Sequence, residues 1–371
     1  MDLSTILLVS AVLSGLAGGV GARFRSWGTS FRDLGVGLML GATITLLTAV
    51  VLALVAGLGR AGLVHLLYLD LVVGVPIAVA LIALPVLLHV DRRRSPVAWA
   101  MILFALVVVA GGLWATHVEP NRLEVHRESL GASGADDPLV VGVLADLQSG
   151  NVGRHERDAV EELLAAEPHV IVIAGDFYEF PDDGTNDAIP EFVGLLRDMT
   201  EAVSLVVMVE GDHEDPDVLS DMAEATGAIL LQDQVLDARV AGQALTIAGL
   251  RNPITDENRL AEEVRSDLSA RSEDELVLLL SHRPDPVLLL DDLAVDLMIA
   301  GHTHGGQVSL PGIGPLVLFS EVPRVVAAGG LHLVDGHPIY VSTGVGMARN
   351  QAPQVRFRVP PSVAILTIVP N

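Results

Sequence analysis

Four long apolar runs dominate the first third of the chain, whereas later apolar runs are short and separated by polar or glycine-containing segments. Each long run has about the 20 residues that a helix needs to cross the hydrocarbon core of a bilayer. Helices of a soluble bundle carry polar faces, and these runs show almost none. The pattern predicts an N-terminal all-α four-helix transmembrane segment in residues 1–118, with helices at 3–22, 34–58, 66–90 and 97–116.

Arginines concentrate in two of the three loops between these runs. The first loop holds Arg23, Arg25 and Arg32, and the third holds Arg92, Arg93 and Arg94, whereas the second holds Arg60. The positive-inside rule then puts the first and third loops in the cytoplasm. We therefore expect a multi-pass, integral plasma-membrane protein with everything after residue 118 extracytoplasmic. Asp70, near the start of the third run, is either an intramembrane functional carboxylate or an interfacial residue at a helix end, and we favour the interfacial position.

The pattern changes after residue 118. Residues 119–138 are polar and contain Gly131–Gly134, which is typical of a linker. Residues 139–371 then alternate short β-rich runs with helical stretches. The predicted strands are 139–145, 170–174, 203–209, 276–280 and 297–300, and the predicted helices are 155–166, 190–200 and 217–226. Near-continuous apolar strands between helices favour buried strands in an α/β layer fold.

Charge separates the same two regions. The chain has a net charge of −24, but residues 1–118 hold 7 Arg and 4 Asp, whereas residues 119–371 hold 15 Arg and 42 acidic residues. A domain with this acidic excess lacks the basic face that meets phosphates, so no nucleic acid partner is expected. The chain has no Cys, so any metal must be bound by His, carboxylate or amide groups.

Metal-binding residue types follow the predicted strands. The five strands lead into Asp146-Leu147-Gln148, Gly175-Asp176, Gly211-Asp212-His213-Glu214, Ser281-His282 and Gly301-His302-Thr303-His304-Gly305-Gly306-Gln307. Ligands of α/β sheets lie at the carboxyl ends of the strands, and the spacing of two puts both imidazoles of the last block on one side of an extended segment. Carboxylates and imidazoles together suit two divalent ions of the Mn²⁺, Fe, Zn²⁺ or Mg²⁺ type.

The order of these motifs resembles the calcineurin-like metallophosphoesterases. The block from Gly301 to Val308 is especially similar to their membrane-attached bacterial and archaeal branch, as are the segments 340–346 and 356–361. The resemblance covers residues 139–371 and implies an α/β metallophosphoesterase domain, a β-sandwich flanked by helices with the site at one sheet edge.

The resemblance also implies roles for individual residues. One metal ion would take Asp146, Gln148, Asp176 and His304, and the other would share Asp176 and take Asp212, His282 and His302. His213 would be catalytic, lying near the scissile phosphate to stabilise the transition state or protonate the leaving oxygen. Family members typically attack phosphorus with a metal-bridging hydroxide.

Two positions depart from the family pattern. Gln148 stands where the family has His, and Asp212 stands where it has Asn. An amide oxygen in place of imidazole favours Mn²⁺ or Mg²⁺ over Zn²⁺, so Mn²⁺ is the preferred cofactor. An Asp should tighten the second metal but reduce its electrophilicity. Glu179 either orients His213 or is an exposed loop carboxylate, and Glu214 is a second candidate for an orienting residue.

These observations favour a membrane-anchored, dinuclear metal-dependent phosphoesterase. It would be a hydrolase acting on a phosphomonoester, phosphodiester or pyrophosphate, with a small phosphate ester or a phospholipid-type molecule as substrate. The alternative is a sensory or binding module that keeps its metal but is catalytically weak, because Gln148 and Asp212 both alter the ligand set. A transporter with an accessory domain would need intramembrane charges, and the apolar runs carry few.

Overall fold

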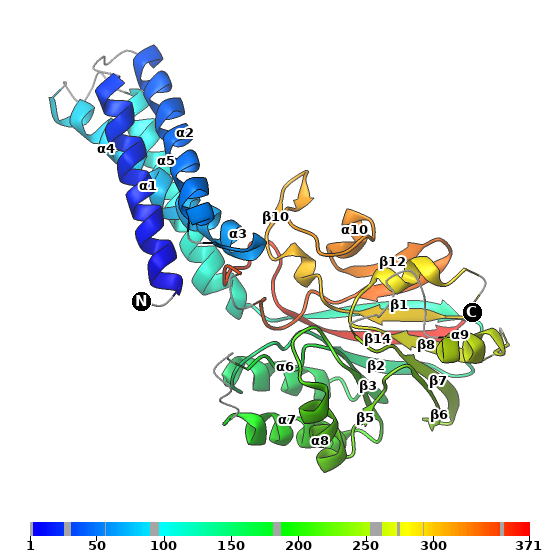
Figure 1. Ribbon diagram of the computed structural model, residues 1–371. Coiled ribbons are helices and arrows are strands. Elements are labelled where there is room, and N and C mark those ends of the chain that lie inside the picture. The colour runs from blue at the N-terminus through cyan, green and yellow to red at the C-terminus, as the bar shows by residue number, and fades with distance from the viewer. Residues whose placement is uncertain are drawn as a thin grey trace. The chain divides into compact units, whose positions relative to one another are not determined.

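The computed structural model describes residues 3–25, 31–55, 57–89, 96–180, 187–252, 262–272, 275–291, 293–348 and 352–371. These residues divide into two compact units. The helical unit comprises Met1–Val118 with Ala348–Gln354, and the α/β unit comprises Glu119–Met347 with Val355–Asn371. The strands all belong to the α/β unit (Figure 1).

All four predicted apolar runs are helical. The elements are α1 (Leu3–Arg25), α2 (Phe31–Val55), α3 (Arg60–Leu69), the π-helical turn η1 (Asp70–Gly74), α4 (Val75–His89), α5 (Pro96–Leu113) and the π-helical turn η3 (Trp114–Val118). The turn η1 joins α3 to α4, so the third run lies within one continuous helical segment that starts at Arg60. Within the unit, α1 packs against α2 and α4, and α4 packs against α5.

Two of these helical segments are long and apolar enough to cross a membrane, namely Gly62–Leu84 and Pro96–Asn121. The apolar stretches Thr5–Val20 and Met39–Val55, which lie within α1 and α2, are shorter. The described helices therefore support membrane association, but the predicted set of four crossings is not confirmed. The loop with Arg92, Arg93 and Arg94, on which the orientation also depends, lies outside the described residues.

The prediction for Asp70 is wrong. Asp70 is buried within the continuous helical segment, where its carboxylate accepts a hydrogen bond from the Ser14 hydroxyl. Thr45 Oγ1 donates to the Ser14 carbonyl at 3.4 Å. A buried carboxylate needs such partners because transfer from water without them is costly. The contact with α1 therefore stabilises a position that the sequence alone assigned to a helix end.

Two six-stranded sheets form the α/β unit. The first has the order β1 (Glu124–Ala132), β14 (Ser362–Pro370), β2 (Leu139–Leu144), β3 (Val170–Ala174), β4 (Val206–Val209) and β5 (Ile229–Leu230). The second has the order β12 (Gly330–Val334), β13 (His337–Val341), β9 (Leu297–Ala300), β8 (Leu276–Leu280), β7 (Gln243–Gly249) and β6 (Gln234–Val240). Strands β2 to β5 are parallel, as are β7, β8, β9 and β13.

The two sheets share one core. Alternate residues of each strand point to opposite faces, so Val170 and Val172 of β3 join the cluster that also contains Leu278 of the second sheet. Ile171 and Ile173 face the other way, into a cluster with α6 (Arg154–Leu164), α7 (Ile189–Ala202) and α8 (Pro216–Thr226). Helices α9 (Glu262–Ser269) and α10 (Arg324–Ala327) contribute to a third cluster on the outer face of the second sheet. The expected sandwich flanked by helices is confirmed.

The five predicted strands are present, with β4 starting at Val206 rather than at residue 203. Residues 119–138, predicted as a linker, instead contribute β1 to the first sheet, in parallel register with β14 from Glu124 opposite Ser362. As the edge strand of the sheet, β1 exposes one side to solvent. An edge strand tolerates charged side chains, so its sequence is as polar as that of a linker.

A buried arginine holds the chain between β13 and β14. Arg356 is fully buried and donates to the carbonyl oxygens of Thr343 at 2.8 Å, Gly344 at 3.0 Å and Val359 at 3.2 Å, and to that of Gly346. The segment that it holds lies against the end of β2, because Gly346 N donates to the Asp146 carbonyl at 2.6 Å.

Replacing Arg356 with Met should destabilise the α/β unit. The change leaves several buried carbonyl groups without donors, at about 1–3 kcal/mol each, so we expect a loss of about 3 kcal/mol. In thermal unfolding of the purified chain this is a decrease of roughly 6–12 °C in midpoint for a domain of this size. Arg358→Met, at an exposed position of the same segment, is the control. Equal midpoints for the two variants would show that the Arg356 contacts contribute nothing.

Candidate metal centre

The ends of five strands converge where the two sheets meet. Strands β2, β3 and β4 of the first sheet lead to Asp146, Gln148, Asp176 and Asp212, and β8 and β9 of the second lead to His282, His302 and His304. His302 Nδ1 lies 2.7 Å from Asp212 Oδ2. His282 Nε2 lies 3.6 Å from Asp176 Oδ2, and His304 Nε2 lies 3.7 Å from Asp146 Oδ1. The structure thus brings together side chains separated by up to 158 positions in the sequence, from Asp146 to His304.

The side chains form two overlapping groups. Ligand atoms of Asp212, His282 and His302 all lie within 4.8 Å of one another, and so do those of Asp146, Asp176 and His282. The two groups therefore share His282, whereas the family pattern gives the shared position to Asp176. Because His282 Nδ1 donates to the Ala174 carbonyl at 3.0 Å, its Nε2 is the nitrogen that faces the carboxylates.

Gln148 lies beside the first group. Its side chain is buried, and its backbone N–H donates to the Asp176 carbonyl at 2.8 Å. The segment after β2 is thereby tied to the segment after β3. A Gln at this position adds an amide oxygen to the buried set without adding a negative charge.

The buried carboxylates of the two groups favour the binding of a cation between them. Burial, reinforced by Asp176 although opposed by His282, raises the pKa of Asp146 to about 7. Burial opposes charge on His282, but the carboxylates of Asp176, Asp212 and Asp146 outweigh it and raise the pKa of this imidazole to about 10. Several carboxylates without cations repel one another in a buried space, because the interaction between charges strengthens as the dielectric constant falls. Divalent ions would relieve this repulsion directly.

His304 has the properties of a neutral ligand. Burial, with smaller contributions from Arg356 and neighbouring histidines, lowers its pKa well below the usual value. Its Nδ1 atom is buried and has no hydrogen-bond partner among the described residues. Buried polar nitrogens are normally paired, and neutral imidazole is the form that binds metals. The donor set therefore fits divalent metal ions of the kind that calcineurin-like enzymes bind.

The backbone at these residues is strained. Asp146, Gln148, Asp176, His302 and His304 have φ angles of 47°, 41°, 50°, 68° and 47°. Residues other than glycine seldom adopt this left-handed region, and such strain persists only where the surroundings enforce it. Five non-glycine residues with this conformation at one site indicate that the fold is built to aim these side chains.

His213 lies at the edge of the cluster. Its backbone N–H donates to Asp176 Oδ1 at 3.1 Å, and 35% of its side chain is exposed, which leaves it accessible to a substrate. Its Nδ1 lies 3.8 Å from Glu179 Oε1. Glu179 is only 5% exposed, so the interpretation as an exposed loop carboxylate is wrong.

The Glu214 carboxylate accepts hydrogen bonds from the backbone of two loops. Its two carboxylate oxygens accept from Phe177 N at 2.5 Å and Gly211 N at 2.6 Å. Burial, with a further contribution from Asp176, raises the pKa of this carboxyl to about 8. Glu214 therefore ties the segments after β3 and β4 together.

A network around Asp212 was not predicted from the sequence. Asp212 Oδ1 accepts from Arg283 Nη2 at 2.9 Å and from Asn252 Nδ2 at 2.8 Å, while Oδ2 faces the histidines. Asn252 N in turn donates to the buried Glu210 at 3.0 Å. Burial opposes ionisation, but His282 and His302 outweigh it and hold the pKa of Asp212 well below its usual range. Only the adjacency of Arg283 to His282 hinted at this arrangement.

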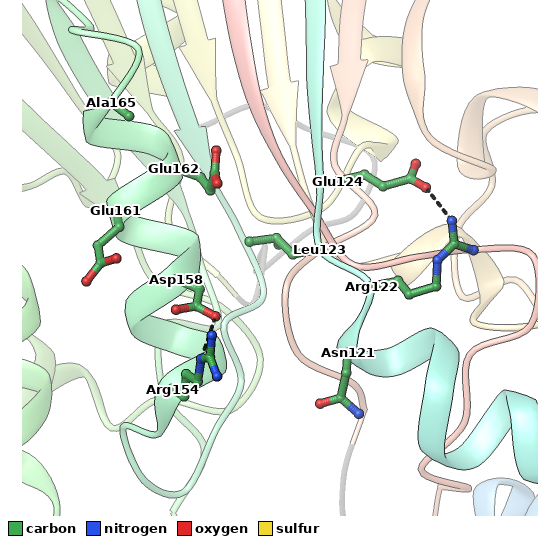
Figure 2. A pocket seen from close by; sticks show the side chains of 9 residues that line it. All are labelled: Asn121, Arg122, Leu123, Glu124, Arg154, Asp158, Glu161, Glu162 and Ala165. Atoms are coloured by element: carbon green, nitrogen blue, oxygen red, sulfur yellow. Dashed lines mark ion pairs between the residues drawn. The ribbon is translucent and has the colours of Figure 1, made fainter.

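A surface pocket of about 700 Å³ lies elsewhere in the α/β unit, between α6 and the start of β1 (Figure 2). Its arginines are already paired, Arg154 with Asp158 at 3.4 Å and Arg122 with Glu124 at 3.7 Å. Its lining residues are Asn121, Arg122, Leu123, Glu124, Arg154, Asp158, Glu161, Glu162 and Ala165. With four acidic and two basic side chains it does not favour a phosphate, and it contains none of the predicted ligands.

Known proteins are similar in sequence to the region that contains the candidate metal centre. Residues 139–306 match the family model described as calcineurin-like phosphoesterase. The uncharacterized metallophosphoesterase YkuE of Bacillus subtilis is 26% identical over 72% of this chain and 93% of its own length. The phosphodiesterase YaeI of Escherichia coli is 25% identical over 76% of this chain and 100% of its own length. An uncharacterized metallophosphoesterase of Aquifex aeolicus is 27% identical over 68% of this chain and 94% of its own length.

The matched region begins at the first residue of β2 and extends through the His302–His304 block. It therefore contains all five strand ends that converge on the site. Residues 139–306 therefore form a calcineurin-like phosphoesterase domain.

Proposed function

We propose that this chain is a membrane-anchored, dinuclear phosphoesterase that hydrolyses a phosphomonoester, phosphodiester or pyrophosphate. The observation that carries the proposal is the convergence of carboxylates and imidazoles from five strand ends, with His304 Nδ1 buried and unpaired among the described residues. The phosphodiesterase YaeI supports a phosphate ester as substrate.

Two ions would divide the donor set. Asp146, Gln148, Asp176 and His304 would hold one, and Asp176, Asp212, His282 and His302 would hold the other. Asp176 Oδ2 and Asp212 Oδ2 each lie 3.6 Å from His282 Nε2. Asp176 therefore lies close to the ligands of the second ion as well as to those of the first, which supports Asp176 as the ligand that the two ions share. Oxygen donors outnumber imidazoles in the first set, which favours Mn²⁺.

When bound, the cations would supply an activated water for attack on phosphorus and neutralise charge that develops on the phosphoryl oxygens. The protein's own groups would do the rest. His213, exposed at the edge of the cluster and beside Glu179, would donate a proton or a hydrogen bond to the leaving oxygen. Glu179 would keep the His213 ring oriented toward the site.

The Arg283–Asp212 pair argues against a catalytically weak binding module. That alternative rests in part on the extra negative charge of Asp212, which would reduce the electrophilicity of a metal. The guanidinium of Arg283 offsets this charge at 2.9 Å from Oδ1. We propose that Asp212 and Arg283 together act as one neutral oxygen ligand, equivalent to the amide usual at this position.

The helices Gly62–Leu84 and Pro96–Asn121 support attachment to the plasma membrane. We retain a multi-pass anchor with an extracytoplasmic α/β unit as part of the proposal, because Arg23 and Arg25 lie at the end of α1 and Arg32 lies at the start of α2. The substrate would then be a phosphate ester outside the cytoplasm.

Replacing His304 with Ala should reduce phosphodiesterase activity by at least about 100-fold, because removal even of outer groups around a metal site costs 10–100-fold. The measurement is hydrolysis of bis(p-nitrophenyl) phosphate with Mn²⁺, together with the bound Mn²⁺ measured by elemental analysis. His337→Ala, a histidine of β13 whose Nε2 contacts the Asp291 carbonyl, is the control. Equal activity and metal content in the two variants would refute the assignment.

A double-mutant cycle tests the Arg283–Asp212 pair. Arg283→Met and Asp212→Asn should each lower kcat/KM about tenfold, because each leaves one charge unbalanced, and the double variant should recover to within about threefold of the original. Contacting residues typically show such coupling. The Mn²⁺ dissociation constant, measured by electron paramagnetic resonance, should tighten in Arg283→Met and weaken in Asp212→Asn. Effects on kcat/KM that simply multiply would contradict the pairing.

Protease added to intact cells tests the topology. An extracytoplasmic α/β unit should be digested without permeabilisation, whereas a cytoplasmic marker protein in the same cells stays intact. Complete protection of the unit until the membrane is opened would reverse the proposed orientation.

A further inference from the structure

The segment that contains His302 and His304 and continues to residue 334 is almost free of charged side chains. Between residues 301 and 334 the charged side chains are Glu321 and Arg324, which balance each other. The surrounding region, residues 119–371, carries 42 acidic residues and 15 Arg. A neutral stretch of this length is therefore a local exception to a strongly acidic surface.

Large apolar side chains are exposed along this segment. Ile313 is 59% exposed, Leu316 47%, Phe319 57% and Val325 64%. We call these four residues the apolar rim. Isolated exposed apolar residues are ordinary, but a larger group of them typically marks an interaction surface. Only Glu321 and Arg324 add charge to this segment, and their charges are opposite.

The apolar rim is held in place by the fold. Ile313 lies in the turn of the hairpin formed by β10 (Ser309–Leu310) and β11 (Gly314–Pro315), with Gly312 and Gly314 at φ 75° and 84°. Arg324 of α10 donates to the Pro315 carbonyl, which links the hairpin to the helix that carries Val325. Val326 and Ala327 of the same helix are buried in the core. The exposed side chains thus project from an ordered support.

The same segment borders the candidate metal centre. His302 Nε2 lies 3.1 Å from the Phe319 carbonyl, so the backbone of the rim contacts a predicted ligand directly. A Cβ atom at Gly306 would meet the Pro315 side chain at 2.6 Å and the Val317 carbonyl at 2.8 Å. The hairpin is therefore packed onto the block that carries His302 and His304.

We propose that the apolar rim docks on the interfacial region of a lipid bilayer, which presents the phosphate of an amphiphilic molecule to the metal centre. The charge pattern favours this occupant, because the acidic remainder of the unit would be repelled by an anionic surface and the neutral rim would not. The membrane-length helices of the same chain keep a bilayer within reach. The assignment of an amphiphilic substrate rests on the proposed phosphoesterase function; the docking of the rim does not.

The chain contains no Cys, so single cysteines can report the environment of chosen positions. Ile313→Cys and Phe319→Cys would be labelled with an environment-sensitive fluorophore in the full-length protein, reconstituted into phosphatidylcholine vesicles. Ala225→Cys, on the exposed face of α8, is the control. Lipids with a nitroxide near the head group should quench both rim labels at least twofold and leave the control label unchanged. Rim labels that resist lipid quenching would overturn the docking proposal, whether they meet water or another part of the protein.

Activity separates the two proposals. Ile313→Ser/Leu316→Ser should hydrolyse a long-chain phosphodiester in vesicles about tenfold more slowly than the original protein and soluble bis(p-nitrophenyl) phosphate at a rate within twofold. Equal loss on both substrates would contradict a role in amphiphile access. If the original protein hydrolyses neither substrate, the phosphoesterase proposal fails, and the quenching result still decides whether the rim meets the bilayer.

Discussion

The accumulation of negative charge in a buried space is the constraint on which the site depends. Asp146 and Asp176 are almost fully buried, and Asp212 lies beside them with 19% of its side chain exposed. Carboxylates this close repel one another, and burial removes the water that would otherwise screen them. Protonation of His282 or the binding of divalent ions would balance this negative charge. The neighbouring carboxylates favour the protonated imidazole, and they raise the pKa of His282 to about 10.

The fold holds this unfavourable cluster through its backbone. The acidic and imidazole side chains of the cluster lie within four residues of the ends of buried strands, and the strands themselves pack into the shared core of the sandwich. Left-handed φ angles at five of the positions turn the side chains toward one another. Glu214 and Arg356 then fix neighbouring segments through backbone hydrogen bonds. The packing energy of the two sheets therefore supports the local strain.

The sequence predicted those parts of the molecule that follow from local pattern. Runs such as Val170–Ala174 are apolar because both faces of the strand are buried, and this is visible without a structure. The edge strand β1 was not predicted, because its polar side chains resemble a linker and only its pairing with β14 identifies it. Asp70 was misplaced for a similar reason, since its partner Ser14 lies 56 residues away.

The candidate site, like the fold, could be predicted from the sequence only in part. Motif order placed the Asp and His residues after their strands, and family resemblance suggested their roles. Neither indicated that Arg283 and Asn252 both bind Asp212, because that contact joins loops from different sheets. The burial of Glu179 was equally hidden, since a loop carboxylate next to aromatic residues has no sequence pattern that separates exposed from buried. Long-range contacts between loops are the part that local sequence does not encode.

We propose that two metal ions share this cluster of strand-end side chains. The most direct measurement is anomalous X-ray scattering at the manganese edge from crystals of the protein grown with Mn²⁺. We expect two peaks about 3.5–4 Å apart, both within coordination distance of the Asp176 carboxylate, with His304 at one and His302 at the other. A single peak, or peaks away from Asp176, would contradict it.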